Sequence, residues 1–413
     1  MISPEFADVE IDSIAAGGDG VGRSAGRVVF VPRSAPGDLA RLRLNAKARF
    51  ARGEIVELLR RSAARVEPPC EHYTRDHCGG CQLQHLSYGA QLGAKRRIVV
   101  ETLARIGKRA VTLDAVHPSA MPWRYRRKLT LAMRRTGTGD WIAGLHPYDD
   151  PDAVFALGDC PITDERVVAT WRAIIGAARL MPNVQRLRGA VRLLDSGASF
   201  VLEGGRQWNA GPALLDAVPG LRAIWWAAED ERPRLVAQRD DEATTGASFA
   251  QVNVAVGAAM HDHVVARVMS YGPSTVVDAY AGTGDTAVRF AAAGARVTAI
   301  EVDRDAADFA GTRLGPPSRS IAGRVEDNIA ASLPADVVVI NPPRTGIDAR
   351  VAAVLERADP APRAVIYVSC DPATLARDLT RMPSYRVVGA AAFDMFPQTA
   401  HVETVCELVP GAG

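Results

Sequence analysis

The residue best suited to covalent chemistry is Cys370, which ends an apolar run. The run from Val365 to Ser369 reads Val-Ile-Tyr-Val-Ser, and Cys370-Asp371-Pro372 follows it. Catalytic groups in open α/β sheets stand at such strand ends, beside the ligand. A small buried hydrophobic cysteine is the alternative, but the polar context of Cys370 argues against it. We therefore expect Cys370 to act as a nucleophile.

Two candidate bases, His401 and Glu403, lie in a polar segment between two apolar runs. They are two positions apart, so on an extended strand their side chains share a face and Val402 points the other way. A pair of solvated surface residues is the alternative. A cysteine nucleophile with a nearby base is the combination that covalent catalysis requires.

A cofactor-binding pattern precedes these residues. The apolar strand Val276-Val277 ends in Asp278, and a turn with Gly282 and Gly284 leads into an alanine-rich helix. Glycines let the backbone approach a ligand closely. A second strand ends in Glu301, where a carboxylate can accept hydrogen bonds from two ribose hydroxyls.

The third strand of this region decides between two cofactor classes. A Gly-x-Gly turn alone is weak evidence, because NAD enzymes use a similar turn, and Ala287 stands at the place of their third glycine. The third strand ends in Asn341-Pro342-Pro343, which favours S-adenosylmethionine (SAM) over a dinucleotide. A doubly wound domain without a cofactor is the remaining alternative.

Cysteine addition and SAM together suit methylation of a pyrimidine at C5. A thiolate that adds to C6 moves electron density onto C5, which can then attack a methyl group. A base must afterwards remove the C5 proton so that the thiolate leaves. Uracil and cytosine enzymes share this addition, so the pattern does not distinguish the two bases.

Four further cysteines suggest a metal centre. Cys70, Cys78 and Cys81 form a C-x7-C-x2-C pattern, and Cys160 follows later. Four cysteine sulfurs can hold zinc or a 4Fe-4S cluster. Zinc ribbons usually carry two C-x2-C pairs, so a triplet with a distant fourth cysteine favours iron–sulfur. His72 and His77 leave a mixed zinc site open.

The charge distribution points to a polyanionic partner. The net charge is only +2, but residues 41–135 hold 21 Lys/Arg against 7 Asp/Glu. Such an excess favours nucleic-acid binding, with a solvated basic surface as the alternative. No apolar stretch is long enough to span a membrane, and the N-terminus does not resemble a signal peptide. We expect a cytoplasmic, monomeric protein without disulfides.

Three regions follow from the patterning. Residues 1–62 contain short strands at about ten-residue spacing, as in an OB-like β-barrel. Residues 63–240 are less regular, with a helix over 88–106 and an extended segment over 129–133. In residues 241–413 the apolar runs 275–278, 296–301, 336–341 and 364–369 alternate with helices. That alternation predicts a parallel sheet buried on both faces.

With these motifs the chain resembles the uracil-5 RNA methyltransferases that act on 23S rRNA and tRNA, over nearly its whole length. The resemblance implies a multidomain protein. Residues 1–62 would be a TRAM domain, an OB-like RNA-binding module. Residues 63–240 would be a central α+β iron–sulfur domain, and residues 241–413 a Rossmann-like class I SAM methyltransferase domain.

The resemblance also assigns roles to single residues. Val368–Pro372 matches the nucleophile motif, and His401–Thr404 matches the base motif, which selects Glu403. It implies a 4Fe-4S cluster on Cys70, Cys78, Cys81 and Cys160, with a longer first spacing than is usual in the family. The implied SAM contacts are Gln251 within Ser248–Asn253, Tyr280, Gly282, Glu301 and Asn341.

One position departs from the family pattern. The family usually carries aspartate where this chain has Asn341. A neutral amide can donate and accept hydrogen bonds, but it cannot act as a base or hold a negative charge. It is therefore open whether this position holds the methyl donor or the uracil ring as it does in the family.

Three alternatives remain. The RNA substrate is expected to be 23S rRNA, but relatives with the same parts act on tRNA. RNA cytosine-5 methyltransferases carry a Pro-Cys motif at the third strand, where this chain has Pro342-Pro343. A non-catalytic RNA-binding iron–sulfur protein would not need both Cys370 and Glu403.

Overall fold

Residues Glu5–Arg60 form a closed five-stranded barrel in the computed structural model, which describes residues 5–239 and 252–411. Its strands are β1 (Glu5–Ile14), β2 (Gly20–Ser24), β3 (Arg27–Val31), β4 (Leu39–Ala46) and β5 (Phe50–Arg60). They pair in the order β1-β2-β3-β5-β4, and β4 closes the ring on β1. Alternate residues point inward, so Val9, Ile11, Val29 and Leu42 fill the interior. The barrel expected from the strand spacing is confirmed, and it fits an OB-like fold.

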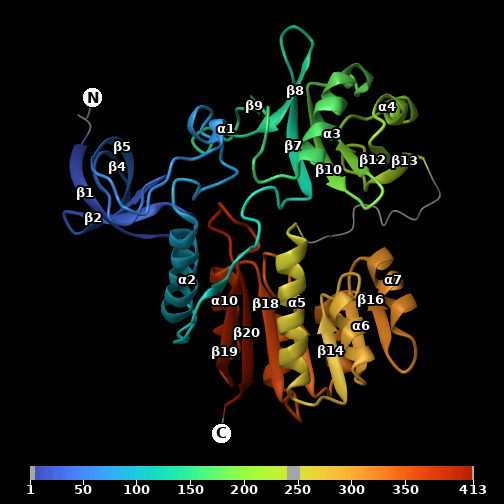
Figure 1. Ribbon diagram of the computed structural model, residues 1–413. Coiled ribbons are helices and arrows are strands. Elements are labelled where there is room, and N and C mark those ends of the chain that lie inside the picture. Colours follow the sequence, from blue (N-terminus) through green and yellow to red (C-terminus); the bar gives the residue numbers. More distant parts are fainter. Residues whose placement is uncertain (1–4, 240–251, 412–413) are drawn as a thin grey trace.

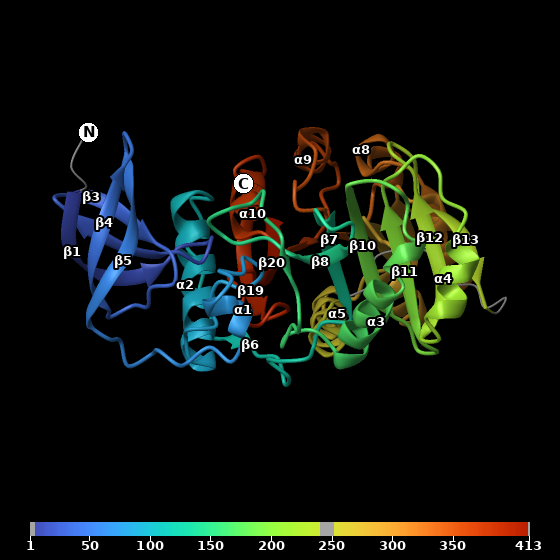
Figure 2. The same cartoon turned by 90° about the horizontal axis from the view of Figure 1, so that it is seen from above.

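A long helix connects the barrel to the rest of the molecule. After the short α1 (Glu71–Thr74), helix α2 (Tyr88–Arg105) lies between the barrel and the C-terminal sheet (Figures 1 and 2). Its residue Ile98 packs with Ile14 of the barrel, while Val99 and Leu103 join the core under the C-terminal sheet. The strand β6 (Val116–His117) then adds to the edge of that sheet. One helix thus touches both flanking units.

The middle of the chain forms a seven-stranded sheet, green in Figure 1. Its order is β13-β12-β11-β10-β7-β8-β9. The strands are β7 (Lys128–Arg135), β8 (Trp141–Leu145), β9 (Phe155–Ala156), β10 (Arg186–Leu193), β11 (Ala198–Glu203), β12 (Leu221–Ala227) and β13 (Arg234–Gln238). The helices are α3 (Glu165–Gly176), η1 (Ala178–Leu180) and α4 (Gly211–Ala217). Trp171 of α3 packs edge-on against Phe200 of β11, so the helical layer covers one face of the sheet.

The C-terminal region forms an eight-stranded sheet in the order β16-β15-β14-β17-β18-β20-β19-β6. Its other strands are β14 (Thr275–Ala279), β15 (Arg296–Glu301), β16 (Arg319–Ala322), β17 (Val337–Ile340), β18 (Ala364–Ser369), β19 (Tyr385–Phe393) and β20 (Glu403–Pro410). The strands β14 to β18 are parallel, and β20 runs antiparallel to β18 and β19. The parallel sheet expected from the Val/Ile runs is present.

Helices cover both faces of this sheet. They are α5 (Val254–Met269), α6 (Asp285–Ala292), α7 (Arg304–Leu314), α8 (Val325–Asn328), η2 (Ala330–Ser332), α9 (Ala349–Glu356) and α10 (Pro372–Leu379). One apolar core joins α5 and α6 to the sheet, and another joins α2, α8, α9 and α10. The parallel strands therefore end together at one edge, between two helical layers. No helix in the described part of the chain is long and apolar enough to cross a membrane.

Candidate active site

Cys370 directly follows β18, and Glu403 begins the neighbouring antiparallel strand β20. In the antiparallel pair β18/β20, Val368 is opposite Val405 and Ser369 is opposite Thr404. The same register, continued one position beyond this last pair, would set Cys370 against Glu403, and the charge of Glu403 acts on the Cys370 thiol. Directly opposed residues of an antiparallel pair share a face, with Cβ atoms roughly 5 Å apart. The fold thus brings the expected nucleophile and the expected base together.

The backbone around Cys370 is fixed by its neighbours. Asp371 caps α10 by accepting hydrogen bonds from the backbone N–H groups of Ala373 and Thr374, each at 2.8 Å. The hydroxyl of Ser369 donates to the carbonyl oxygen of Asp371 at 2.9 Å. The thiol of Cys370 is free and half-buried. A capped strand-to-helix turn therefore presents the sulfur at the strand end.

The electrostatics of the pair depend on Arg344. Burial raises the pKa of Glu403 to about 7, and the positive charge of Arg344 acts against this rise. Burial is the largest cause that raises the pKa of the Cys370 thiol, and the negative charge of Glu403 raises it further. The positive charge of Arg344 lowers it. Arg344 was not among the predicted site residues. Its signal in the sequence is an arginine directly after the Pro-Pro that ends β17.

His401 lies just before the strand that Glu403 begins, and exposure alternates over His401, Val402 and Glu403. Strand β20 begins only at Glu403, and Gln398 upstream has a left-handed φ of +70°. In the segment Asp394–Val402, two backbone N–H groups donate to the side chains of Gln82 and Gln91 and not to a neighbouring strand. His401 lines a cavity, and burial lowers the pKa of its ring.

The expected donor residues lie at the ends of β14, β15 and β17. The carboxylate of Glu301 accepts hydrogen bonds from the N–H groups of Gly282 and Asp303, both at 2.8 Å, which fixes the glycine turn. Tyr280 and Gly282 have φ angles of +63° and +55°. The backbone N–H of Asn341 donates to Ala279 O at 3.2 Å. These residues therefore share one edge of the sheet.

Two further points concern the donor end. Asp278 is buried and accepts a hydrogen bond from the Thr286 hydroxyl at 2.7 Å. Burial raises the pKa of its carboxyl to about 6, and the Thr286 bond opposes the rise. Gln251, the remaining expected SAM contact, lies outside the described residues.

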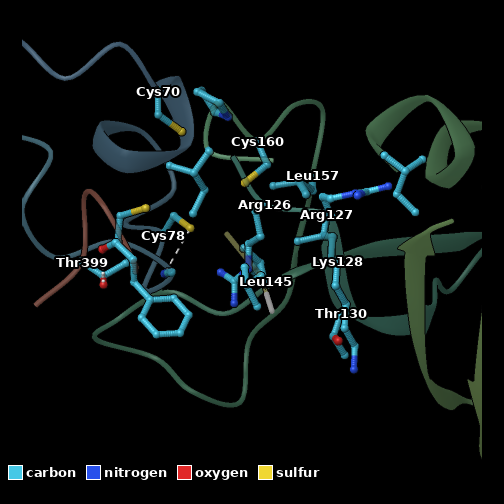
Figure 3. Close-up of a pocket in the computed structure, with 18 of the residues that line it drawn as sticks. Cys70, Cys78, Arg126, Arg127, Lys128, Thr130, Leu145, Leu157, Cys160 and Thr399 are labelled. Carbon is cyan, nitrogen blue, oxygen red and sulfur yellow. Dashed lines mark hydrogen bonds between the residues drawn. The ribbon is translucent and has the colours of Figure 1, made fainter. Parts of the chain in front are cut away.

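The four expected metal ligands line one cavity of about 820 Å³. Cys70, Cys78, Cys81 and Cys160 are free and buried. Figure 3 shows Cys70, Cys78 and Cys160 around one space, with Arg126 nearby. Burial raises the pKa of all four thiols, and for Cys78 and Cys81 the other cysteines add to the rise. Within the described residues, no group of three or more Cys, His, Asp or Glu side chains is arranged to hold a metal ion.

Neither histidine of this segment is positioned as a metal ligand. Both ring nitrogens of His72 are engaged, with Nδ1 2.6 Å from Asp76 and Nε2 accepting from the Gly158 N–H at 3.0 Å. The exposed ring of His77 lies 2.6 Å from Asp149 and stacks on Tyr148. A mixed cysteine–histidine set is therefore disfavoured, and the four sulfurs remain as the candidate donors.

A basic arc lies on the wall of the same cavity, comprising Arg126, Arg127, Lys128, Arg192 and Arg344. Arg127 pairs with the exposed Asp195 at 3.3 Å, whereas Arg126, Lys128 and Arg344 form no ion pair with any residue that the structure describes. Burial lowers the pKa of Lys128, and the like charges of Arg192 and Arg188 lower it further. Such uncompensated charge suits a phosphate backbone.

The barrel, by contrast, is nearly neutral. Residues 5–60 hold nine Lys/Arg and eight Asp/Glu, a net charge of +1. Arg41 pairs with Asp8, and Arg43 pairs with Glu54. The positive excess seen in the sequence therefore lies mainly after the barrel, where residues 61–135 hold 15 Lys/Arg and 5 Asp/Glu.

Comparison with known proteins agrees with this arrangement. The family described as tRNA (Uracil-5-)-methyltransferase matches residues 319–409. An RNA methyltransferase of Gloeobacter violaceus is 32% identical over 99% of this chain and 97% of its own length. The 23S rRNA (uracil(1939)-C(5))-methyltransferase RlmD of an Azoarcus species is 30% identical over 96% of this chain and 98% of its own length.

A solved structure supports the same fold. The Pyrococcus abyssi tRNA (uracil-54, C5)-methyltransferase, in complex with S-adenosyl-L-homocysteine, has a TM-score of 0.68 and 23% identity. The match covers 97% of this chain and 99% of that one. With a methyltransferase sheet, relatives that match end to end, and a family match over the strands that carry Cys370 and Glu403, the chain belongs to the SAM-dependent RNA uracil-5 methyltransferases.

Proposed function

We propose that this enzyme forms 5-methyluridine in 23S rRNA, with Cys370 as nucleophile and Glu403 as general base. The observation that supports the mechanism is the β18/β20 register, which continued by one pair would set the two side chains opposite each other at the edge where the donor residues end their strands. A nucleophile and a base at one strand edge suit covalent addition followed by proton removal.

The reaction balances as follows. The Cys370 thiolate forms a bond to C6 of uracil, and C5 takes the methyl group from SAM, which leaves S-adenosylhomocysteine. Glu403 removes the proton from C5, and the electrons of that C–H bond restore the C5–C6 double bond as the bond between sulfur and C6 breaks. Its electron pair leaves with sulfur and returns the thiolate.

Arg344 has a role in this sequence through charge. Thiols attack as thiolates, and the pKa of Cys370 is raised by burial and by Glu403. The guanidinium of Arg344 favours the negative forms of both side chains. We infer that Arg344 stabilises the thiolate and keeps part of Glu403 ionised at neutral pH.

The donor would be held at the neighbouring strand ends. Tyr280, Gly282, Glu301 and Asn341 are its proposed contacts, together with Gln251. The carboxylate of Glu301 already accepts one N–H group on each oxygen, and each oxygen keeps a further lone pair for a ribose hydroxyl. SAM supplies an electrophilic methyl group there.

We also propose that the cysteine cavity holds a 4Fe-4S cluster. In a cluster each cysteine binds a different iron, so the four sulfurs stand farther apart than around one ion. The support for the cluster is the set of four buried cysteines around one cavity. The bound cluster would be structural, because methyl transfer involves no net oxidation or reduction.

Iron content tests the cluster directly. Protein purified without oxygen should contain about four irons per chain, as a cubane on four cysteines requires. Stoichiometric zinc in their place would overturn the assignment. Cys406→Ser, which changes a buried cysteine of β20 outside the cavity, serves as a control that should keep its iron.

The preference for 23S rRNA is supported by the Azoarcus relative, which matches this chain over nearly its whole length at 30% identity. The Pyrococcus tRNA enzyme, at 23% identity, supports tRNA as a second candidate substrate. Mapping 5-methyluridine in the rRNA and tRNA of a deletion strain decides between them. Loss of one 23S rRNA site supports the proposal, and loss of a tRNA site overturns it.

The covalent mechanism has its own test. Cys370→Ala should abolish methyl transfer and leave SAM binding intact. Glu403→Gln should accumulate a protein–RNA adduct, visible as a shifted band on a denaturing gel, because the C5 proton stays in place. Turnover by Cys370→Ala would contradict covalent addition.

A further inference from the structure

The segment Asp394–Val402, here called the base loop, connects β19 to Glu403 and is held by contacts from distant parts of the chain. At its start, Asp394 forms a fully buried ion pair with Lys95 of α2 and accepts a hydrogen bond from the Tyr88 hydroxyl at 2.8 Å. The hydroxyl of Tyr125 donates to Pro397 O at 3.0 Å. The loop that leads to the proposed base is therefore bound on several sides.

Gln398 is the most connected residue of the base loop. Its side-chain oxygen accepts from Gln91 Nε2 at 2.9 Å, and its own backbone N–H donates to Gln91 Oε1 at 3.0 Å. Its carbonyl oxygen accepts from the N–H groups of Gln82 and Leu83, at 3.2 and 2.9 Å. Gln398 is 2% exposed and Gln91 1% exposed. Two reciprocal bonds thus join Gln398 to helix α2.

The contacts of Gln398 reach the cysteine segment. Gln82 follows Cys81 directly, and its Nε2 donates to Gly79 O at 2.9 Å. Its Oε1 accepts from the backbone N–H of Ala400 at 3.3 Å. One side chain therefore ties the turn that holds Cys78 and Cys81 to the residue before His401.

The barrel reaches the same place. A Cβ atom added to Gly18 would lie 2.4 Å from Cβ of Gln82 and 3.3 Å from Cβ of Ala400. Ile14 and Ala35 of the barrel region belong to one apolar cluster with Leu83 and Ala400. Barrel, cysteine segment and α2 therefore meet at the base loop.

We propose that Gln398 is a positioning residue, which joins the base loop to α2 and to the cysteine segment and so sets the place of Glu403 opposite Cys370. This inference rests on the proposed roles of those two residues. Buried amides are costly unless every hydrogen bond is made, so the Gln398–Gln91–Gln82 network specifies one arrangement of the loop. Apolar packing alone would allow several arrangements of the loop.

Two variants separate positioning from folding. Gln398→Ala removes the side-chain bonds and leaves a left-handed backbone that alanine adopts poorly. Gln398→Gly removes the same bonds but accepts the positive φ without strain. Exposed Gln207→Ala is the matched control.

The measurement follows a single turnover with uridine-containing RNA and records both formation and decay of the covalent adduct. We expect both Gln398 variants to bind SAM within about twofold of wild type, because the donor residues lie at other strand ends. Adduct decay should slow about ten- to hundredfold, as misplacement of a catalytic group by an ångström does. Gln91→Ala should reproduce the effect, and Gln91→Ala combined with Gln398→Gly should add little.

The outcomes are distinct. Wild-type adduct decay in a folded, SAM-binding Gln398→Gly protein overturns the inference and leaves the proposed function standing. A parallel loss of SAM binding and adduct formation also overturns it, because the residue would then serve folding alone. Absence of an adduct in Glu403→Gln overturns the proposed role of Glu403 and this inference with it.

Discussion

At the scale of single residues, Glu403 and Arg344 set a pH dependence. As the proposed base, Glu403 must be ionised to accept the C5 proton, and burial raises its pKa to about 7. The ionised fraction therefore rises from about one tenth at pH 6 to about nine tenths at pH 8. Decay of the covalent adduct in a single turnover should therefore become faster over this range.

Removing Arg344 should move this profile to higher pH. Its charge lowers the pKa of both Cys370 and Glu403, so Arg344→Met should raise both. The rate at pH 7 should fall about tenfold or more, and part of it should return at pH 9, as a pKa shift of one unit predicts. Exposed Arg357→Ala should keep the wild-type profile. A rate lowered equally at every pH would show that Arg344 does not act through the two pKa values.

Asn341 offers a second residue-scale prediction. It ends β17 beside Ala279 and is exposed, where related enzymes usually carry aspartate. SAM bears a positive sulfonium and a positive ammonium group, so Asn341→Asp should tighten SAM binding several-fold, in line with about 1 kcal/mol for one exposed charge pair. Isothermal titration calorimetry at low and high salt measures this. Weaker binding by the aspartate variant would mean that the amide donates a needed hydrogen bond.

At the scale of elements, the buried pair Lys95–Asp394 fixes helix α2 to the base loop. Both side chains are fully buried. Lys95→Met leaves the Asp394 carboxylate without its cation, which typically costs about 3–5 kcal/mol of stability. Urea unfolding should show this loss, while Lys47→Met on the barrel surface should change the free energy of unfolding little. A loss below about 1 kcal/mol, the range of exposed pairs, would argue that water reaches the pair.

The strands could be predicted from the sequence where periodicity dominates. The apolar runs 296–301 and 364–369 coincide with β15 and β18, because strands buried on both faces need continuous Val/Ile runs. The path of the segment before Glu403 could not be read from the sequence, since Gln398 bonds to a side chain 307 positions away. No local pattern contains such partners.

At the scale of the whole molecule, the sequence identified the chemistry but not how the parts meet. Cys370, Glu301 and Gly282 stand out in the sequence because each ends or follows a strand with a recognisable pattern, and their roles stay predictions. The convergence of barrel, α2 and cysteine segment on the base loop depends on tertiary contacts among Gly18, Gln82 and Ala400. Helix α2 and β6, which precede the seven-stranded sheet in the chain, pack on the C-terminal sheet instead.

The charge of the whole molecule predicts how it binds RNA. The excess of +14 over residues 41–135 would suggest a uniformly basic front, but the barrel is nearly neutral because it holds almost as many acidic as basic residues. We therefore expect the basic arc, and not the barrel, to supply most of the phosphate contacts. Each contact releases counterions, so log K should fall linearly with log salt.

Two variants of the arc and one of the barrel separate these possibilities. Arg126→Ala and Lys128→Ala should each reduce the slope of log K against log salt for single-stranded oligouridine by about one. Arg43→Ala, which removes a cation already paired with Glu54 at the barrel surface, should leave the slope nearly unchanged. The reverse result, a slope lowered only by Arg43→Ala, would place the phosphate path on the barrel. In that case only the flipped base would enter the cavity behind the arc. The target base must be unstacked to reach Cys370, whichever surface of the protein holds the RNA strand.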